Sequence, residues 1–239
     1  MTFSLVIPCY NEARALPALA ARCSEVIAAV PGCEIILVDN GSTDGTPTVM
    51  PALTAGTPGL RGLRVERNQG YGHGILAGLN ASAGDVLGWT HADLQTDPMD
   101  TAQAFALFTL TEHPERLYVK GRRQGRPLGD RVFTAGMSAF ETLLLRTPLI
   151  DVNAQPNVFH RSFFEGWRDA PQDFSLDLYA YYSARRVGLE VVRIPVMFGA
   201  RAFGVSHWNV DWRGKAKFIR RTVAFSLTLR SRLRAGGSL

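Results

Sequence analysis

The stretch that decides the fold is "DVLGWTHADLQTDP", residues 85–98. Its short apolar run, "VLGW", predicts a buried strand, because polar and turn-forming residues bound the run. Asp93 and Asp97 follow, with Gln95 between them and His91 just before. Carboxylate and amide oxygens are the ligands that Mg²⁺ and Mn²⁺ prefer, so a strand that ends in them suits a divalent cation. Asp97, which precedes a proline, is expected to cap the following helix.

Strand and helix signals alternate on both sides of this stretch. Short apolar, β-rich runs occupy residues 4–10, 33–40, 63–68, 85–91, 116–123 and 189–198. Helical spacing of apolar residues, or a helix-start signal, occurs in residues 12–29, 74–83, 97–113, 132–145 and 176–187. Residues 151–161, "DVNAQPNVFHR", are expected to be irregular. The alternation predicts an α/β fold with a mainly parallel central sheet and helices on both faces.

The composition is that of an ordinary globular protein. The chain has 239 residues, of which 46% are hydrophobic, and it carries a net charge of +5. The positive charge favours anionic partners such as nucleotides, phosphates or lipid surfaces. Cys9, Cys23 and Cys33 are odd in number and lack metal-site spacing, which indicates reduced, buried thiols in a cytoplasmic protein. No basic segment precedes the first apolar run, and no apolar stretch reaches the ~18–20 residues that span a bilayer.

Polar residues follow the predicted strands at the point where each strand ends. They are Asn11, Glu12, Asp39, Asn68, Asp93 and Arg122. Because ligands of such sheets bind at the carboxyl ends of the strands, we expect these residues to form one site. Within it, Asp39 is suited to accept hydrogen bonds from a base or ribose, and Asp44 to cap the next helix.

Two motifs at this edge allow more than one interpretation. His91 is suited to bind Mn²⁺, to hydrogen-bond a diphosphate, or to do neither as a solvated loop residue. Gly70, Gly72 and Gly74 precede a helix whose first amides are able to face phosphate oxygens. These glycines do not follow the first strand, as the dinucleotide-binding fingerprint requires, which argues against a Rossmann oxidoreductase.

Six motifs, in this order, resemble the family-2 glycosyltransferases with a GT-A fold. They are "VIPCYNE" (6–12), "VDNGSTDGT" (38–46), "NQGYGHGILAGLNASAGD" (68–85), "ADLQTDP" (92–98), "GRR" (121–123) and "VVRIPVMFGARAFGVSHW" (191–208). The branch that looks most similar is that of the dolichol- or polyprenyl-phosphate sugar synthases. The resemblance covers roughly residues 3–208. It implies a GT-A glycosyltransferase domain over residues 1–210, followed by a separate basic helix over residues 211–239.

The resemblance also implies roles for individual residues. The residues implied at the nucleotide are Pro8, Tyr10, Glu12, Asp39 and Asn68. Asp93 and Gln95 would hold Mg²⁺ or Mn²⁺ on the diphosphate, with His91 as a helper. Arg122 and Arg131 would face the acceptor phosphate. Arg201 and Ser206 would belong to a segment that closes over the nucleotide-sugar.

The chain departs from the family pattern in three places. The family usually has aspartate where this chain has His91, which bears on metal binding. The family's usual lysine after the serine is replaced by His207. A glycine-aromatic-basic triplet is more usual where this chain has Gln155, Pro156 and Asn157, which bears on the acceptor or the sugar.

Three functions fit these observations. The first is an inverting glycosyltransferase that moves a sugar from a nucleotide-diphosphate sugar to a polyprenyl phosphate, whose ionised oxygen needs no base. The second is the same transferase acting on a saccharide hydroxyl in glycan synthesis, which needs a base. Asp177 is the candidate for that base, and Asp151 a weaker one. The third is a nucleotide-sugar-binding protein without activity.

The C-terminal segment informs the choice of acceptor. Residues 213–239 contain eight basic residues and no acidic one, and Phe218, Phe225 and Leu229 fall at helical spacing between them. Such a helix lies at an anionic membrane surface or packs on the domain with a solvated basic face. With the resemblance, this favours a peripheral protein at the inner face of the membrane. No nucleic-acid-binding module accompanies the charge, and the sequence leaves open whether the chain forms a homo-oligomer.

Overall fold

A computed structural model of the chain describes residues 1–199 and 212–234. In these residues, seven strands form one sheet in the order β3–β2–β1–β4–β6–β5–β7. The strands are β1 (Phe3–Cys9), β2 (Cys33–Asn40), β3 (Leu60–Val65), β4 (Val86–Trp89), β5 (Leu117–Gln124), β6 (Asn157–His160) and β7 (Glu190–Met197). Neighbouring strands are parallel except at β6, which runs antiparallel to β4 and β5. The predicted α/β fold with a mainly parallel sheet is confirmed.

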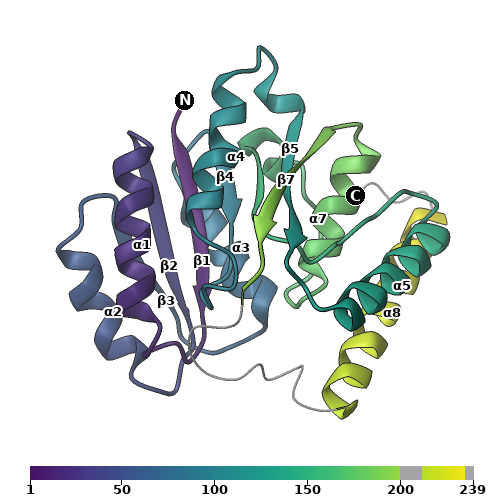
Figure 1. The fold of residues 1–239 in the computed structure, drawn as a ribbon, viewed down its shortest axis with the longest axis horizontal. Helices are drawn as coiled ribbons and strands as arrows, with labels where there is room; N and C mark the ends of the chain where they lie inside the picture. The colour runs from purple at the N-terminus through teal and green to yellow at the C-terminus, as the bar shows by residue number, and fades with distance from the viewer. Residues whose placement is uncertain (200–211, 235–239) are drawn as a thin grey trace.

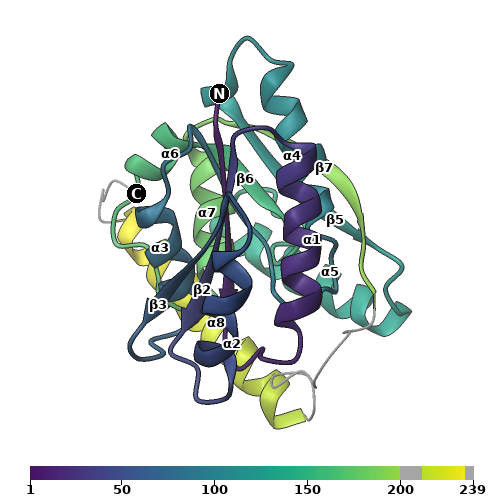
Figure 2. The same ribbon diagram turned by 90° about the vertical axis from the view of Figure 1, so that its left-hand side faces the viewer.

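Helices cover both faces of the sheet (Figures 1 and 2). They are α1 (Leu16–Ala29), α2 (Thr46–Ala55), α3 (Tyr71–Ala81), α4 (Met99–Thr109), α5 (Leu128–Leu145), α6 (Arg161–Glu165), α7 (Leu176–Arg186) and α8 (Trp212–Arg234), with a 3₁₀ turn, η1, at Pro114–Arg116. Figure 2 shows α1 and α4 on one side of the strands and α3 and α7 on the other. Figure 1 shows α5 beside α8 at the end of the molecule opposite α2.

Two apolar layers hold these helices on the sheet. In β1, Leu5 and Ile7 pack into the layer beneath α1 and α4, while Val6 packs into the layer beneath α3 and α7. All three side chains are fully buried. A strand buried on both faces reads as a continuous apolar run, which explains why the sequence signal of β1 is so clear. The three cysteines are buried and free, as predicted.

β6 lies in the segment that the sequence predicts to be irregular. The strand is only four residues long and begins with Asn157, a polar residue that is nevertheless fully buried. Its burial depends on hydrogen-bonding partners from distant segments, so no local pattern of apolar residues announces it. Several boundaries also differ by three or four residues; for example, β3 begins at Leu60 rather than 63, and α5 at Leu128 rather than 132.

The strand register brings the predicted polar residues to one edge. Cys9 of β1 pairs with Asp39 of β2, and Val6 pairs with Trp89 of β4. Because these strands are parallel, Asp39 and the loop after Trp89 lie at the same carboxyl edge, on either side of β1. Two strand spacings put the backbones of β2 and β4 about 10 Å apart. Antiparallel β6 brings its first residue, Asn157, opposite Trp89 at this edge.

Candidate functional site

Asp39, the penultimate residue of β2, is a buried carboxylate. Its side chain is 2% exposed, and its Oδ1 accepts a hydrogen bond of 2.9 Å from the amide of Ser42. Oδ2 lies 3.4 Å from Nη1 of Arg64, but within the described residues it makes no hydrogen bond. A buried polar atom without a hydrogen-bond partner is unusual in folded proteins. Asp39 is therefore able to accept one further hydrogen bond from a ligand, as the sequence predicts.

The loops after β1 and β2 are hydrogen-bonded to each other. The amide of Asn11 donates to Oγ of Ser42 at 3.0 Å, and the amide of Thr43 donates to Oδ1 of Asn11 at 2.8 Å. Asp44 accepts from the amide of Thr46 at 2.9 Å, but the residue at the N-cap of α2 is Gly45, so Asp44 lies one position before the cap rather than at it as predicted. These bonds hold the end of β1 against the end of β2.

The other residues predicted at the nucleotide lie at the end of β1, in the loop after it and in the loop after β3. Pro8 and Glu12 are half-buried, Tyr10 is 42% exposed, and Asn68 is exposed. Asn68 accepts a hydrogen bond of 2.9 Å from the amide of Gly70. The structure thus gathers the four residues around the carboxyl ends of β1, β2 and β3.

The three glycines at the start of α3 allow close packing. A Cβ at Gly70 would lie 2.4 Å from the carbonyl oxygen of Gln172, and one at Gly74 would lie 2.8 Å from Cγ of Asn40. Gly70 has a φ of 125°, which side chains rarely allow. The amide of His73 donates to the carbonyl of Gln172 at 2.8 Å. The glycine motif thus joins α3 to β2 and to residues 171–173.

The loop after β4 holds Asp93 in a tight turn. Asp93 is 7% exposed, and its Oδ1 accepts a hydrogen bond of 3.1 Å from the amide of Gln95. Leu94 between them has a left-handed φ of 56°, a costly conformation that clusters at functional sites. Gln95 also makes two hydrogen bonds to Gly199, of 2.8 and 3.2 Å. Arg201 and Ser206 lie outside the described residues.

His91 is tied to the first residue of α3. Its Nε2 lies 2.9 Å from the hydroxyl of Tyr71, and the two rings meet edge to face with centroids 5.4 Å apart. The adjacent Gly70 accepts a hydrogen bond of 2.9 Å from Nδ2 of Asn40, at the end of β2. The start of α3 therefore connects the Asp39 side of the edge with the Asp93 side.

These residues fit a hard divalent cation with few protein ligands. Within residues 1–199 and 212–234, no three histidine, cysteine or acidic side chains converge as a complete metal cage. Asp93 supplies one carboxylate, and Gln95, whose Nε2 donates to Gly199, keeps its Oε1 for a ligand. Mg²⁺ and similar ions are commonly held by one or two carboxylates plus water and substrate phosphates.

Asp177 lies below this edge, in the layer between the sheet and α7. It is 1% exposed. Its Oδ1 accepts three hydrogen bonds, from Nε1 of Trp89 at 3.2 Å, Nε2 of Gln155 at 2.9 Å and Nδ2 of Asn157 at 3.1 Å. Three hydrogen bonds stabilise the carboxylate and hold it in place, whereas a general base must reach its substrate.

Lys120 is a buried polar residue that the sequence reasoning missed. It is fully buried, and its Nζ donates to the carbonyl of Ala154 at 2.8 Å and to Oδ1 of Asn157 at 2.6 Å. Burial lowers the pKa of Lys120 to about 7. In the sequence it is one residue of the strand-like run 116–123, and nothing local distinguishes it from an exposed lysine.

Arginines surround the ends of β5 and β7. The predicted residues Arg122 and Arg131 are exposed, near the carboxyl end of β5 and in the first turn of α5. Asp151 forms an ion pair with Arg123 and is 3.8 Å from Arg126. Burial alone would raise the pKa of Asp151, but the hydrogen bonds from Arg123 outweigh it and lower the pKa. A carboxylate held this way is a poor base.

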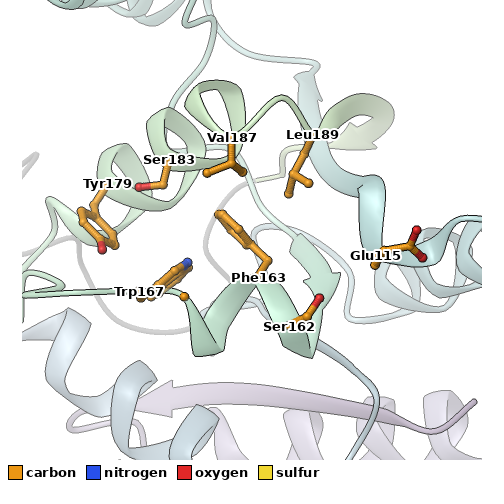
Figure 3. Close-up of a pocket in the computed structure, with 9 residues that line it drawn as sticks. Glu115, Ser162, Phe163, Trp167, Tyr179, Ser183, Val187 and Leu189 are labelled. Atoms are coloured by element: carbon orange, nitrogen blue, oxygen red, sulfur yellow. The ribbon is translucent and has the colours of Figure 1, made fainter. Parts of the chain in front are cut away.

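A pocket of about 300 Å³ between α6 and α7 lies at the edge of the sheet opposite the carboxyl ends of the parallel strands (Figure 3). Phe163, Trp167, Tyr179 and Leu189 are among the residues that line it. α6 follows the end of antiparallel β6, and Leu189 directly precedes β7, so the lining comes from the amino edge of the parallel strands. In the described part of the chain, no residue predicted for the site lines this pocket.

Comparison with known sequences identifies relatives over most of the chain. The undecaprenyl-phosphate 4-deoxy-4-formamido-L-arabinose transferase of Yersinia pestis is 39% identical over 101 residues, covering 41% of this chain and 31% of the relative. The transferase of the same name from Sodalis glossinidius is 29% identical over 223 residues, covering 87% of this chain and 63% of the relative. Glycosyltransferase AglD of Haloferax volcanii is 26% identical over 207 residues, covering 81% of this chain and 32% of the relative. The chain thus spans less than two thirds of these relatives.

Comparison with solved structures supports the fold. Glucosyl-3-phosphoglycerate synthase of Mycobacterium tuberculosis superposes with a TM-score of 0.71 at 20% identity, covering 96% of this chain and 79% of that one. Such low identity shows the shared GT-A fold alone. The model of the family described as glycosyl transferase family 2 matches residues 4–165, which include Asp39, Asp93 and Gln95. The chain therefore belongs to glycosyl transferase family 2.

Proposed function

We propose that this chain is an inverting glycosyltransferase that moves a sugar from a nucleotide-diphosphate sugar to a polyprenyl phosphate. Family membership supports transfer of a sugar. The relatives from Yersinia pestis and Sodalis glossinidius are named as transferases that act on undecaprenyl phosphate. The structural relative from Mycobacterium tuberculosis was solved with Mn²⁺ and uridine diphosphate.

The state of Asp177 is the observation that carries the choice of acceptor. A sugar hydroxyl must lose a proton to a base within about 3 Å as it attacks. Asp177, the candidate for that base, is 1% exposed and accepts three hydrogen bonds on one oxygen. Asp151, the other candidate, is engaged by Arg123. A phosphate acceptor is already ionised near neutral pH, so it reacts without either residue.

The nucleotide-sugar is proposed to bind across the carboxyl ends of β1, β2 and β4. Asp39 accepts a hydrogen bond from the base or ribose through its Oδ2. Pro8, Tyr10 and Glu12 line the same end of the sheet. Asp93 and Gln95 are proposed to hold Mg²⁺ or Mn²⁺, which when bound offsets the negative charge of the leaving diphosphate.

The acceptor phosphate is proposed to bind at Arg122 and Arg131. Both guanidinium groups are exposed near the carboxyl edge of the sheet, where charge-assisted hydrogen bonds orient a phosphate strongly. The attacking oxygen then approaches the anomeric carbon from the face opposite the diphosphate. A single displacement of this kind forms one C–O bond as the other breaks, and it inverts the anomeric centre. An ionised nucleophile of this kind needs mainly to be held in the correct orientation, and the two arginines provide that positioning.

The lipid acceptor requires a surface that meets the membrane, and α5 offers one. Leu128, Val132 and Leu143 of α5 are 65–80% exposed and fall on one helical face. Arg131 is exposed next to them. No helix in the described ranges is long and apolar enough to span a bilayer. We propose that α5, together with the basic segment 211–239, lies on the anionic inner face of the membrane.

A test of this function uses purified protein, Mn²⁺ and a panel of uridine- and guanosine-diphosphate sugars. One set of reactions contains undecaprenyl phosphate in vesicles, and the other contains soluble saccharides. We expect a lipid-linked monosaccharide of inverted anomeric configuration. Transfer to saccharides, or no lipid product with any nucleotide-sugar, would overturn the proposal.

Asp177→Asn separates the two acceptor classes further. If Asp177 were the base, its loss would lower turnover by about 10²–10⁴-fold. With a phosphate acceptor, we expect the activity of the folded fraction to fall less than about tenfold. Thermal melting reports that folded fraction, and binding of a nucleoside diphosphate shows whether the remaining fold still holds the nucleotide.

A further inference from the structure

His91 ends a chain of hydrogen bonds that starts at the buried Lys120 and becomes partly exposed at Tyr71. Nζ of Lys120 donates to Oδ1 of Asn157 at 2.6 Å, and Nδ2 of Asn157 donates to Oε1 of Gln155 at 2.8 Å. Nε2 of Gln155 lies 3.3 Å from the hydroxyl of Tyr71, which in turn lies 2.9 Å from Nε2 of His91. The chain crosses from β5 through β6 to the start of α3 and the loop after β4. It therefore links the metal loop to the interior of the sheet.

Asp177 fixes the orientation of both amides in this chain. Its carboxylate only accepts hydrogen bonds, and it lies 2.9 Å from Gln155 and 3.1 Å from Asn157. The nitrogen of each amide must therefore face it. Lys120 and the hydroxyl of Tyr118 both reach Oδ1 of Asn157, which agrees with this assignment from the other side.

The orientation of Gln155 decides where the phenolic proton of Tyr71 points. One hydrogen of the Gln155 amide goes to Asp177, and the other is directed at the oxygen of Tyr71. That oxygen accepts from Gln155, and Nε2 of His91, 2.9 Å away, is the ring nitrogen within reach of the proton of Tyr71. Burial of the hydroxyl, with Asp177 and Asp93 nearby, raises the pKa of Tyr71 well above its usual value. Tyr71 therefore keeps this proton.

A histidine whose Nε2 accepts a hydrogen bond carries its own proton on Nδ1. We propose that His91 is a hydrogen-bond donor, whose Nδ1–H binds the diphosphate of the nucleotide-sugar, and that Tyr71 is the positioning residue that imposes this tautomer. The proposal rests on the function proposed above, because it names the part of the substrate that His91 contacts. It assigns His91 to the leaving group rather than to the metal.

Coordination of a cation by His91 would require a different network. Binding through Nε2 would displace the hydroxyl of Tyr71 and leave it without its present partner. Binding through Nδ1 would need the proton on Nε2, where it would face the proton of Tyr71. Both arrangements cost a buried hydrogen bond, whereas donation from Nδ1 keeps every bond in the chain.

The tautomer is measured directly by NMR of the ¹⁵N-labelled full chain without ligands. The chain has five histidines, so a spectrum of His91→Asn identifies the signal of His91 by its disappearance. We expect a proton on Nδ1 in the parent chain and a shift toward the Nε2–H form in Tyr71→Phe. Tyr71→Phe retains the ring that stacks on Phe174 at 4.8 Å, so it removes only the hydroxyl. A proton on Nε2 in the parent chain would overturn the proposal.

Binding measurements test the role of that proton. The amide nitrogen of asparagine mimics Nδ1 of histidine, and that of glutamine mimics Nε2. We expect His91→Asn to keep its affinity for uridine or guanosine diphosphate within about threefold, and His91→Gln and Tyr71→Phe to lose about tenfold or more. Mn²⁺ affinity without nucleotide should stay within about twofold in all three variants. His113→Asn, which changes a histidine 65% exposed in its side chain before β5, is the matched control.

The outcomes separate this inference from the proposed function. A fall in Mn²⁺ affinity in both His91 variants would make His91 a ligand and would overturn the inference while leaving sugar transfer intact. A chain that binds nucleoside diphosphate through His91 but transfers no sugar would overturn the proposed function alone. Equal loss of nucleotide affinity in His91→Asn and His91→Gln would also contradict donation from Nδ1.

Discussion

Asp93 and Asp97 stand four residues apart in one loop, yet their surroundings give them different roles. Asp93 is buried, and its carboxylate accepts from the amide of Gln95 within a strained turn. Asp97 is exposed, pairs with Arg22, and accepts a hydrogen bond of 2.9 Å from the amide of Met99 at the start of α4. The N-cap of α4 is Pro98, so Asp97 lies one residue before the cap rather than at it as predicted, while still accepting from the first turn. Asp93, the proposed cation ligand, is therefore the carboxylate whose burial costs more free energy.

Exchanging these two carboxylates for amides forms a matched pair of experiments. Asp93→Asn should lower transfer about 10²–10³-fold, because the amide binds a divalent cation weakly and the leaving diphosphate is less stabilised. Asp97→Asn should leave transfer within about twofold and cost less than about 1 kcal/mol of stability, since asparagine also caps helices well. Steady-state rates with and without Mn²⁺ distinguish the two. Similar losses in both variants would contradict the assignment.

Glu141 of α5 is a buried acid whose effect on stability depends on pH. Burial raises its pKa to about 7 from 4.5. The folded state therefore binds its proton more tightly than the unfolded state. Stability from this group is complete below pH 4.5 and is lost as the pH rises through 7, by about 3 kcal/mol at most.

Glu141→Gln removes this dependence. We expect the variant to gain stability relative to the parent chain between pH 5 and pH 8, by about 1–3 kcal/mol, in denaturant unfolding at both values. The exposed Glu165 offers the control, since Glu165→Gln should show the same difference at both pH values. A stability gap between Glu141→Gln and the parent that does not change with pH would refute this explanation.

At the level of single residues, the sequence identified the candidates whose place next to a predicted strand marked them. Asp39 directly follows an apolar run, and Asp93 lies in the polar stretch after one; the structure places Asp39 at the penultimate position of β2 and Asp93 in the loop after β4. Tyr71 was hidden within a glycine motif, and Lys120 within a strand. Their roles depend on hydrogen bonds to Gln155 and Asn157, and Asn157 lies 37 positions from Lys120 in the chain. Such pairings exist only after folding, so periodicity does not reveal them.

At the level of elements, the strands with long apolar runs were predicted and the short antiparallel one was not. β1, β2, β4, β5 and β7 match the expected segments to within one residue at the start, because their apolar runs pack into the buried layers on at least one face of the sheet. β6 packs into its place through residues such as Asn157, whose polar side chain gives no strand signal. Residues 155–157 and His91 both depart from the family pattern. In the structure they belong to one hydrogen-bonded network, because the hydroxyl of Tyr71 contacts both Gln155 and His91.

Two glycines test how closely the elements pack. A Cβ at Gly121 of β5 would lie 1.8 Å from the carbonyl oxygen of Gln155, whereas one at Gly136 of α5 would meet nothing within 4 Å. We expect Gly121→Ala to destabilise the fold by about 2–3 kcal/mol or more. Gly136→Ala should stabilise it by about 0.5–1 kcal/mol, as alanine favours the helix. Urea unfolding measures both, and a mild effect at Gly121 would mean that the segment before β6 moves freely.

For the whole molecule, the proposed orientation on the membrane depends on the exposed face of α5. The variant Leu128→Glu with Val132→Glu should bind vesicles of anionic lipid at least about tenfold more weakly, because it removes apolar side chains that would enter the interface. Leu110→Glu changes a residue that is 81% exposed beyond the end of α4 and should bind normally. Vesicle co-sedimentation compares the three proteins. Equal binding by all of them would place the contact surface elsewhere.

The reversed direction of β6 has a consequence for how such a protein can diversify. In a parallel sheet, segments that lead into strands arrive at the edge away from the ligand. The chain enters β6 from the ligand side of the sheet, so residues 151–156 lie on that side. The carboxyl end of β6 lies at the opposite edge, next to the aromatic pocket. The stretch 151–156 is largely buried and carries Gln155, whose side chain contacts Tyr71 and Asp177. A different residue at position 155 would therefore change the hydrogen bonds that reach the ligand side of the sheet, while the order of the strands stayed the same.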